Sequence, residues 1–149
     1  MPIDWKEDFE TNDPKIDDQH RLLFRFTNKL ETFLSEDHVS DQEVDRLLRF
    51  LEVYVKSHFQ YEEACMLKRR CPHAKANRAA HQSFLEFFEK TVASYQSEGF
   101  TKGWLRSLHD FLQNWLTSHI CHIDAQLRHC GQSPVLGSTD AGSAARSHA

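Results

Sequence analysis

The stretch DQEVDRLLRFLEVYVKSHFQYEEAC, Asp41–Cys65, decides the fold of this chain. Its apolar residues recur in alternating steps of four and three, which is the spacing of one face of an α-helix. These residues are Val44, Leu48, Leu51 and Val55. The same face then continues through His58 and Glu62, so the pattern predicts a long helix whose buried side changes from apolar to polar near its end.

Local signals set the two ends of this helix. Ser40 and Glu43 form an S-x-x-E capping box, in which the serine side chain accepts from a backbone N–H of the first turn. We therefore expect the helix to begin near Asp41. Pro72 lacks the N–H that a helix interior needs, and we expect it to stop the helix.

Three further segments show the same helical periodicity. We expect helices over about Asp17–Glu36 and His73–Ser97, and a last helix that Thr101 caps and Gly131 ends. Their inward positions are Leu23, Thr27, Leu30 and Leu34, then Asn77, His81, Phe84, Phe88, Thr91 and Tyr95, then Leu105, Leu108, Leu112, Trp115 and His119. Four helices joined by short connections predict an all-α, up-down-up-down antiparallel four-helix bundle.

The size and composition of the chain suit one domain. It has 149 residues, of which 40% are hydrophobic and 27% charged, as in soluble globular proteins. Residues 131–149, GQSPVLGSTDAGSAARSHA, are rich in Gly, Ser and Ala and show no periodicity. We interpret residues 1–130 as the folded domain and residues 131–149 as a disordered tail or a linker.

Several classes of protein are disfavoured. The net charge is −4 and no basic run stands out, which argues against binding to nucleic acid or anionic lipid. No apolar run approaches the ~20 residues that span a bilayer, and the N-terminus MPIDWKEDFE is too acidic for a signal peptide, so we expect a cytoplasmic protein. The four cysteines form no CxxC pair, and in that compartment we expect reduced thiols.

Polar residues on the inward faces gather at one end of the predicted bundle. Antiparallel packing places the beginnings of the first and third helices beside the ends of the second and fourth. Residues four apart lie ~40° apart around a helix and ~6 Å along it, so His58 points inward with Glu62, and Asn77 with His81. The candidate set is His20, His58, Glu62, Asn77, His81, His119 and Asp124.

Burial of so many polar groups at one level indicates a metal centre. A buried polar group without a partner costs about 1–3 kcal/mol, and a charged carboxylate costs more. Imidazole nitrogens with carboxylates suit iron, zinc or manganese, and a carboxylate between two sets of histidines commonly bridges two metal ions. A bundle whose histidines bind one zinc ion, or no metal, is the alternative interpretation.

Other patterns narrow the type of site. No E-x-x-H occurs, which disfavours a ferritin-like carboxylate-rich centre, and the absence of HExxH removes the common zinc protease. Asp124 lies five residues after His119, ~140° around an ideal helix, so spacing alone does not favour it over His122. The remaining histidines fall off the inward faces or at helix ends, where we expect them in solvent: His38, His73, His109, His129 and His148.

These motifs, taken in order, resemble bacterial hemerythrin domains. The matching elements are IDDQH at residues 16–20, HFQYE at 58–62, Asn77-x-x-x-His81 followed by Phe84, and HICHID at 119–124. The resemblance covers about residues 5 to 130, and the combination is specific where each element alone is weak. It implies a hemerythrin four-helix bundle that holds two iron ions with an oxo or hydroxo bridge.

The resemblance also implies a role for each residue. Glu62 and Asp124 would bridge the two irons, His20 and His58 would complete one iron, and His81 and His119 would bind the other. The family's third histidine on that second iron is expected at position 77, where this sequence has Asn77. An amide is a poorer donor than an imidazole, so Asn77 is either a weak oxygen ligand or marks a position open to water or a small anion.

The expected function follows from the family. Its members bind O2 in an apolar pocket, for which Leu23, Val55, Phe84 and Trp115 are candidates, and NO and small anions are further ligands. With one imidazole fewer, the centre is better suited to a switch, so we predict a non-catalytic O2 or redox sensor. Its output would be a fused or partner module such as a diguanylate cyclase or a chemoreceptor. The alternatives are a stand-alone oxygen carrier and, ranked lower, a di-iron peroxidase or NO reductase.

Overall fold

The computed structural model describes residues 2–122 and 126–130, and of His122 only the backbone. Four long helices form the fold: α1 Pro14–Ser35, α2 Asp41–Lys68, α3 Ala74–Glu98 and α4 Lys102–His122. Two short helices accompany them, η1 Glu7–Phe9 and α5 Leu127–Cys130. Within these described ranges there is no strand, and the expected all-α four-helix class is confirmed.

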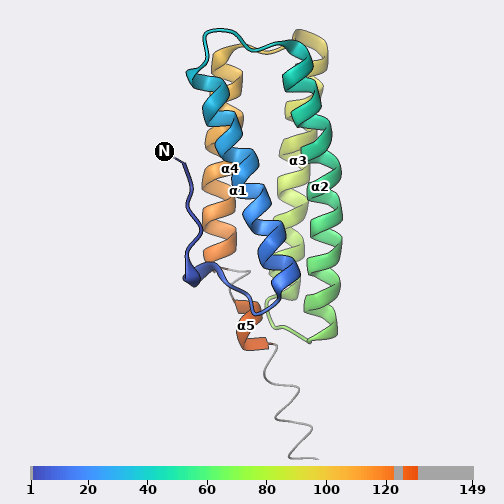
Figure 1. Ribbon diagram of the computed structural model, residues 1–149. Coiled ribbons are helices and arrows are strands. Elements are labelled where there is room, and N and C mark those ends of the chain that lie inside the picture. Colours follow the sequence, from blue (N-terminus) through green and yellow to red (C-terminus); the bar gives the residue numbers. More distant parts are fainter. Residues whose placement is uncertain (1, 123–125, 131–149) are drawn as a thin grey trace, which may run out of the picture.

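The long helices alternate in direction around the bundle (Figure 1). Both α1 and α3 pack against α2 and α4, so each helix lies beside the one that precedes or follows it. The beginnings of α1 and α3 therefore meet the ends of α2 and α4 at the lower end of Figure 1, close to α5. This is the end at which the sequence places the polar residues.

Side-chain caps start the helices largely where the sequence predicts. The Ser40 hydroxyl accepts from the Glu43 N–H at 3.2 Å, and Thr101 accepts from the Trp104 N–H at 3.1 Å. α1 begins three residues before the expected Asp17. The carboxylate of Asp13 accepts from the backbone N–H groups of Lys15 and Ile16. Between them and Asp13 stands Pro14, a residue type that is favoured at the first position of a helix.

The helix ends show one departure from expectation. Gly99 stops α3 with a φ of 76°, a conformation that glycine adopts without steric penalty. The last long helix, expected to run to Gly131, ends in the described structure at His122, and α5 forms a separate short helix. Gly131 and Asp124 lie outside the described residues, as does the predicted tail at 131–149.

The apolar core fills the bundle above the polar end. Leucine and phenylalanine side chains dominate it, and the most deeply buried include Leu30, Leu51, Phe84, Phe88 and Leu105. Aromatic rings continue this core toward the polar end, where Phe84 lies edge-on to Phe59 with ring centroids 5.5 Å apart. A second, smaller cluster closes the lower end beside α5 and contains Ile16, Met66 and Leu127.

The expectation that all four cysteines are free thiols is wrong for two of them. Cys71, in the α2–α3 connection, and Cys130, in α5, form a disulfide with Cα atoms 5.3 Å apart. The two residues are 59 positions apart in sequence, and only the packing of α5 under the bundle brings them together. Cys65 and Cys121 are free and half-buried.

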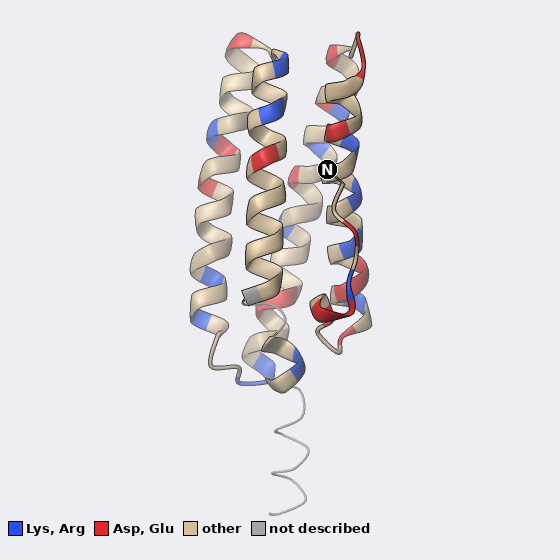
Figure 2. Ribbon diagram, turned by 90° about the vertical axis from the view of Figure 1, so that its left-hand side faces the viewer, with Lys and Arg blue, Asp and Glu red and all other residues tan. Residues whose placement is uncertain are grey.

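Charged residues lie along the outer surfaces of the helices. On the side seen in Figure 2, Lys and Arg residues are interspersed with Asp and Glu residues, and acidic residues gather in η1 and the adjoining N-terminal segment. Among the described residues, none of the helices is long and apolar enough to cross a membrane.

Candidate metal centre

Glu62 stands at the middle of the polar end of the bundle. Its side chain is fully buried on α2, and its two carboxylate oxygens face different histidines. Oε2 lies 3.0 Å from Nε2 of His20 on α1 and 3.4 Å from Nε2 of His58, one turn earlier on α2. One carboxylate oxygen and two imidazole nitrogens thus form the first of two groups able to hold a metal ion.

The other oxygen of Glu62 serves the second group. Oε1 lies 2.9 Å from Nε2 of His81 on α3 and 3.9 Å from Nε2 of His119 on α4. These two imidazole nitrogens are 3.2 Å apart. Because both groups share Glu62, the geometry is that of two adjacent metal positions joined by one bridging carboxylate.

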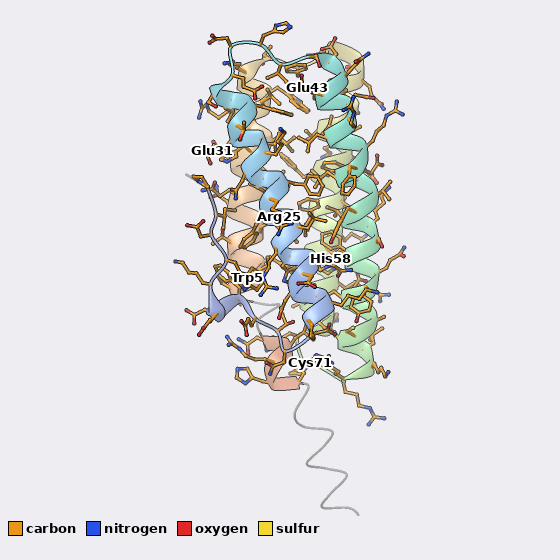
Figure 3. The ribbon with its side chains drawn as sticks, in the orientation of Figure 1. Trp5, Arg25, Glu31, Glu43, His58 and Cys71 are labelled. Atoms are coloured by element: carbon orange, nitrogen blue, oxygen red, sulfur yellow. A yellow bond between two sulfur atoms is a disulfide. The ribbon has the colours of Figure 1, made fainter. Side chains whose placement is uncertain are left out.

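The sequence therefore locates these side chains well. His20, His58, Glu62, His81 and His119 come from four different helices and are all buried in one cluster. In Figure 3, His58 lies within the lower half of the bundle, above Cys71. Asp124 lies outside the described residues, and the side chain of His122 is not described, so the choice between them rests on the resemblance alone.

Two hydrogen-bond partners outside this cluster were not predicted. Nδ1 of His58 donates to the amide oxygen of Gln19 at 2.6 Å, and Nδ1 of His81 donates to the carboxylate of Glu63 at 3.0 Å. Because these oxygens accept, each Nδ1 is the donor, and Nε2, the nitrogen that faces Glu62, is the one that would bind a metal ion. The one sequence signal for these partners is adjacency, because Gln19 directly precedes His20 and Glu63 directly follows Glu62.

Asn77 is completely buried on α3, one turn before His81. Neither its amide oxygen nor its amide nitrogen has a hydrogen-bond partner among the described residues. Such an unpaired polar group costs about 1–3 kcal/mol. The structure thus places an unsatisfied donor and acceptor at the position where the resemblance expects a third imidazole, which fits a group held at this site.

Burial and neighbouring charges set the ionisation of the cluster. Burial lowers the pKa of His58 to about 3, against the opposing attraction of Glu62. Burial raises the pKa of Glu62, but the surrounding histidines have the larger effect and hold that pKa well below its ordinary value. His58 acts through electrostatic attraction, and His119, His20 and His81 act through hydrogen bonds. At neutral pH the cluster presents a carboxylate and a neutral His58, the forms that bind metal.

These shifts predict a pH dependence for the metal-free protein. The folded pKa of His58 lies below its unfolded value of 6.5, so between the two the unfolded state binds more protons and folding stability falls as pH falls. Between pH 7 and pH 5 this residue alone should remove about 2 kcal/mol from the free energy of unfolding. Urea titrations of metal-free protein at both pH values measure the change. His58→Gln should flatten the difference, and an equally steep dependence in that variant would contradict the expectation.

His109 departs from the prediction that it lies in solvent. It is 5% exposed on α4, where its Nδ1 lies 3.0 Å from Asp110 and its Nε2 lies 3.6 Å from Glu31 of α1. The α1–α4 contact covers it, which the inward pattern of α4 did not reveal. It lies ten residues before His119, about 15 Å along the helix, and so belongs to no part of the cluster.

A small apolar cavity lies in the core of the bundle, next to rings that cover two of the histidines. Its volume is about 10 Å³, room for roughly one water-sized molecule. Its walls include all of the predicted pocket residues: Leu23, Val55, Phe84 and Trp115. Two of the aromatic rings that line the cavity also contact the histidine cluster. Phe59 stacks on His81 with ring centroids 3.8 Å apart, and Trp115 stacks on His119 with ring centroids 4.3 Å apart. These two rings therefore lie between the cavity and the second group of histidines.

Comparison with known proteins agrees with the geometry. The family model of the hemerythrin HHE cation binding domain matches residues 11–128. A bacteriohemerythrin of Clostridium acetobutylicum is 27% identical over 128 residues, covering 82% of this chain and 95% of that protein. Hemerythrin subunit alpha of Lingula reevii is 30% identical, covering 80% and 86%. A crystal structure of wild-type hemerythrin superimposes with a TM-score of 0.74 at 26% identity, covering 87% of this chain and 98% of that chain.

The donor set fits the cofactor of this family. Imidazole nitrogens and a shared carboxylate suit iron, and the paired groups around Glu62 provide for two ions. The predicted di-iron cofactor and the resemblance to bacterial hemerythrins are thus confirmed. This chain belongs to the hemerythrin family of O2-binding di-iron domains.

Proposed function

We propose that this domain is an O2 and redox sensor that acts on a signalling output, rather than a catalyst. The observation that carries this proposal is Asn77, which is buried one turn before His81 and has no hydrogen-bond partner in the described part of the chain. A centre with one imidazole fewer holds its ions in a less saturated environment, which suits reversible change of state better than long-term storage. The Gly- and Ser-rich composition of residues 131–149 supports a linker to a fused module such as a diguanylate cyclase or a chemoreceptor.

The proposal assigns the ligands as the resemblance does. Glu62 and Asp124 would be shared by the two ions. His20 and His58 would hold one ion, and His81 and His119 would hold the other. When bound, the iron pair supplies the two electrons that O2 uptake requires.

The protein's own residues control access to this pair. Phe59 and Trp115 stack against histidines of the second position and, together with Phe84, wall the adjoining cavity. This apolar wall excludes water from the side of the core. On the α3 side, the two polar atoms of Asn77 have no partner among the described residues and can hydrogen-bond a water molecule or a small anion.

The first test restores the missing imidazole. Asn77→His should slow autoxidation of the diferrous protein and weaken azide binding, each by roughly tenfold, which corresponds to about 1.4 kcal/mol. Optical spectra recorded after exposure to air, and azide titrations, measure both effects. His73→Ala, one turn earlier at the start of α3, is the matched control and should behave as the wild type. An unchanged autoxidation rate in Asn77→His would refute the role given to Asn77.

Oxygen carriage is the second candidate function, because the enclosed apolar cavity would also protect bound O2. Mixing diferrous protein with O2 in a stopped-flow instrument separates the two. A sensor should pass rapidly to the diferric state, whereas a carrier should hold a long-lived oxygenated form. Persistence of that form for minutes would favour the carrier.

A further inference from the structure

We propose that Glu63 is a positioning residue that strengthens His81 as a metal donor and thereby offsets the imidazole absent at Asn77. The inference rests on the ligand assignment of the proposed function. Glu63 follows Glu62 directly in sequence, but the two side chains contact different nitrogens of the His81 ring. The hydrogen bond from His81 to Glu63 would thus compensate for the ligand that Asn77 replaces.

The contact between Glu63 and His81 joins α2 to α3. Oε2 of Glu63 accepts from Nδ1 of His81 at 3.0 Å, while Nε2 of His81 faces Glu62 at 2.9 Å. The ring is 2% exposed, and Phe59 covers its face. His81 is therefore held between two carboxylates, one at each ring nitrogen. An outer carboxylate of this kind fixes the ring and raises the basicity of the nitrogen that binds metal.

His58, at the first metal position, has a neutral outer partner instead. There the outer partner of His58 is Gln19, whose amide oxygen is neutral. Hydrogen bonds to an ionised acceptor are roughly twice as strong as those between neutral groups. The charged partner thus belongs to His81, one turn after Asn77, and the neutral partner belongs to His58. This asymmetry is what the proposal explains.

A purely structural role for Glu63 is the competing explanation. Its other oxygen lies 3.4 Å from Nε of Arg78, whose side chain is 70% exposed. Exposed ion pairs of this kind contribute little to stability, and removal of Arg78 should leave metal binding unchanged. If Glu63 served only this pair, loss of its charge would affect metal binding as little as loss of Arg78.

The test is a double-mutant cycle read by metal affinity rather than by O2 chemistry. Metal-free protein is titrated with Co²⁺, whose visible absorption reports binding at each position. Glu63→Gln keeps an acceptor oxygen and removes the charge, and should weaken the second position roughly tenfold. Glu63→Ala removes the bond as well and should weaken it by up to about 100-fold. In an Asn77→His background, the same changes should weaken it no more than about threefold.

Two further variants complete the cycle. Arg78→Ala should leave both affinities within about twofold of the wild type. Gln19→Leu should weaken the other position by a factor that is the same with Asn77 or histidine at position 77. Unchanged affinity in Glu63→Ala, or equal losses in both backgrounds, overturns the proposal. Because Co²⁺ titration involves no O2, this result is independent of the stopped-flow and autoxidation tests of sensing. Circular dichroism confirms that each variant is folded.

Discussion

Replacing Glu62 by glutamine is expected to abolish the di-iron centre. Its two oxygens face separate pairs of histidines at 2.9–3.9 Å, so no other described residue contacts both metal positions. An amide keeps the size of the side chain and loses the negative charge that offsets two cations. Even outer-shell changes reduce metal affinity about 10–100-fold, and loss of a shared inner ligand should exceed 100-fold. Metal analysis should find the bound iron reduced at least about tenfold, with the charge-transfer absorption lost.

The matched control is Glu52→Gln on the same helix. Glu52 pairs with Lys56 at 3.2 Å on the outer side of α2 and has no contact with the histidines. It should retain full iron content and a wild-type spectrum. If the Glu62→Gln variant is folded by circular dichroism and still keeps most of its iron, the two metal positions do not depend on the shared carboxylate.

The second large effect is expected from Phe84→Ala. Phe84 is 1% exposed, and its ring centroid lies 4.7 Å from that of Trp115 and 5.5 Å from that of Phe59, the two rings that stack on histidines of the buried cluster. Removal of a buried phenylalanine ring typically lowers the free energy of unfolding by 3–5 kcal/mol, because both the transfer energy and the packing contacts are lost. Urea unfolding of the metal-free variant measures this loss.

Phe87 provides the comparison on the same helix. It is 38% exposed and stacks on Phe111 at 3.8 Å near the surface, so Phe87→Ala should lose about 1 kcal/mol or less. The Phe84 variant should also enlarge the cavity beside His81 and admit water, which should speed autoxidation, whereas Phe87→Ala should not. Equal stability losses in the two variants would contradict the central place given to Phe84.

Periodicity predicted the cluster because its residues stand at inward positions of helices. His58 and Glu62 continue the apolar face of α2, and His81 continues that of α3, so burial follows from register alone. Antiparallel order then placed them at one end without further information. His109 was missed for the converse reason. It lies beside the inward face of α4, and its burial depends on how closely α1 approaches.

Contacts between distant segments were beyond the reach of the pattern. The disulfide joins residues 59 positions apart through the placement of α5, which no periodic signal marks. Gln19 and Glu63 stand next to cluster residues in sequence, yet their partners lie 39 and 18 positions away. Which ring nitrogen each one fixes depends on the rotation of two helices about their axes.

The sequence by itself determined the four-helix bundle and the identity of most of the cluster, because a helix converts spacing along the chain directly into direction around an axis. Only the tertiary structure decided how Glu62 divides its oxygens between two histidine pairs and which outer groups contact His58 and His81. It also decided that the Asn77 amide has no hydrogen-bond partner among the residues that the structure describes. Those features depend on ångström-scale distances between helices, which packing sets and spacing cannot encode.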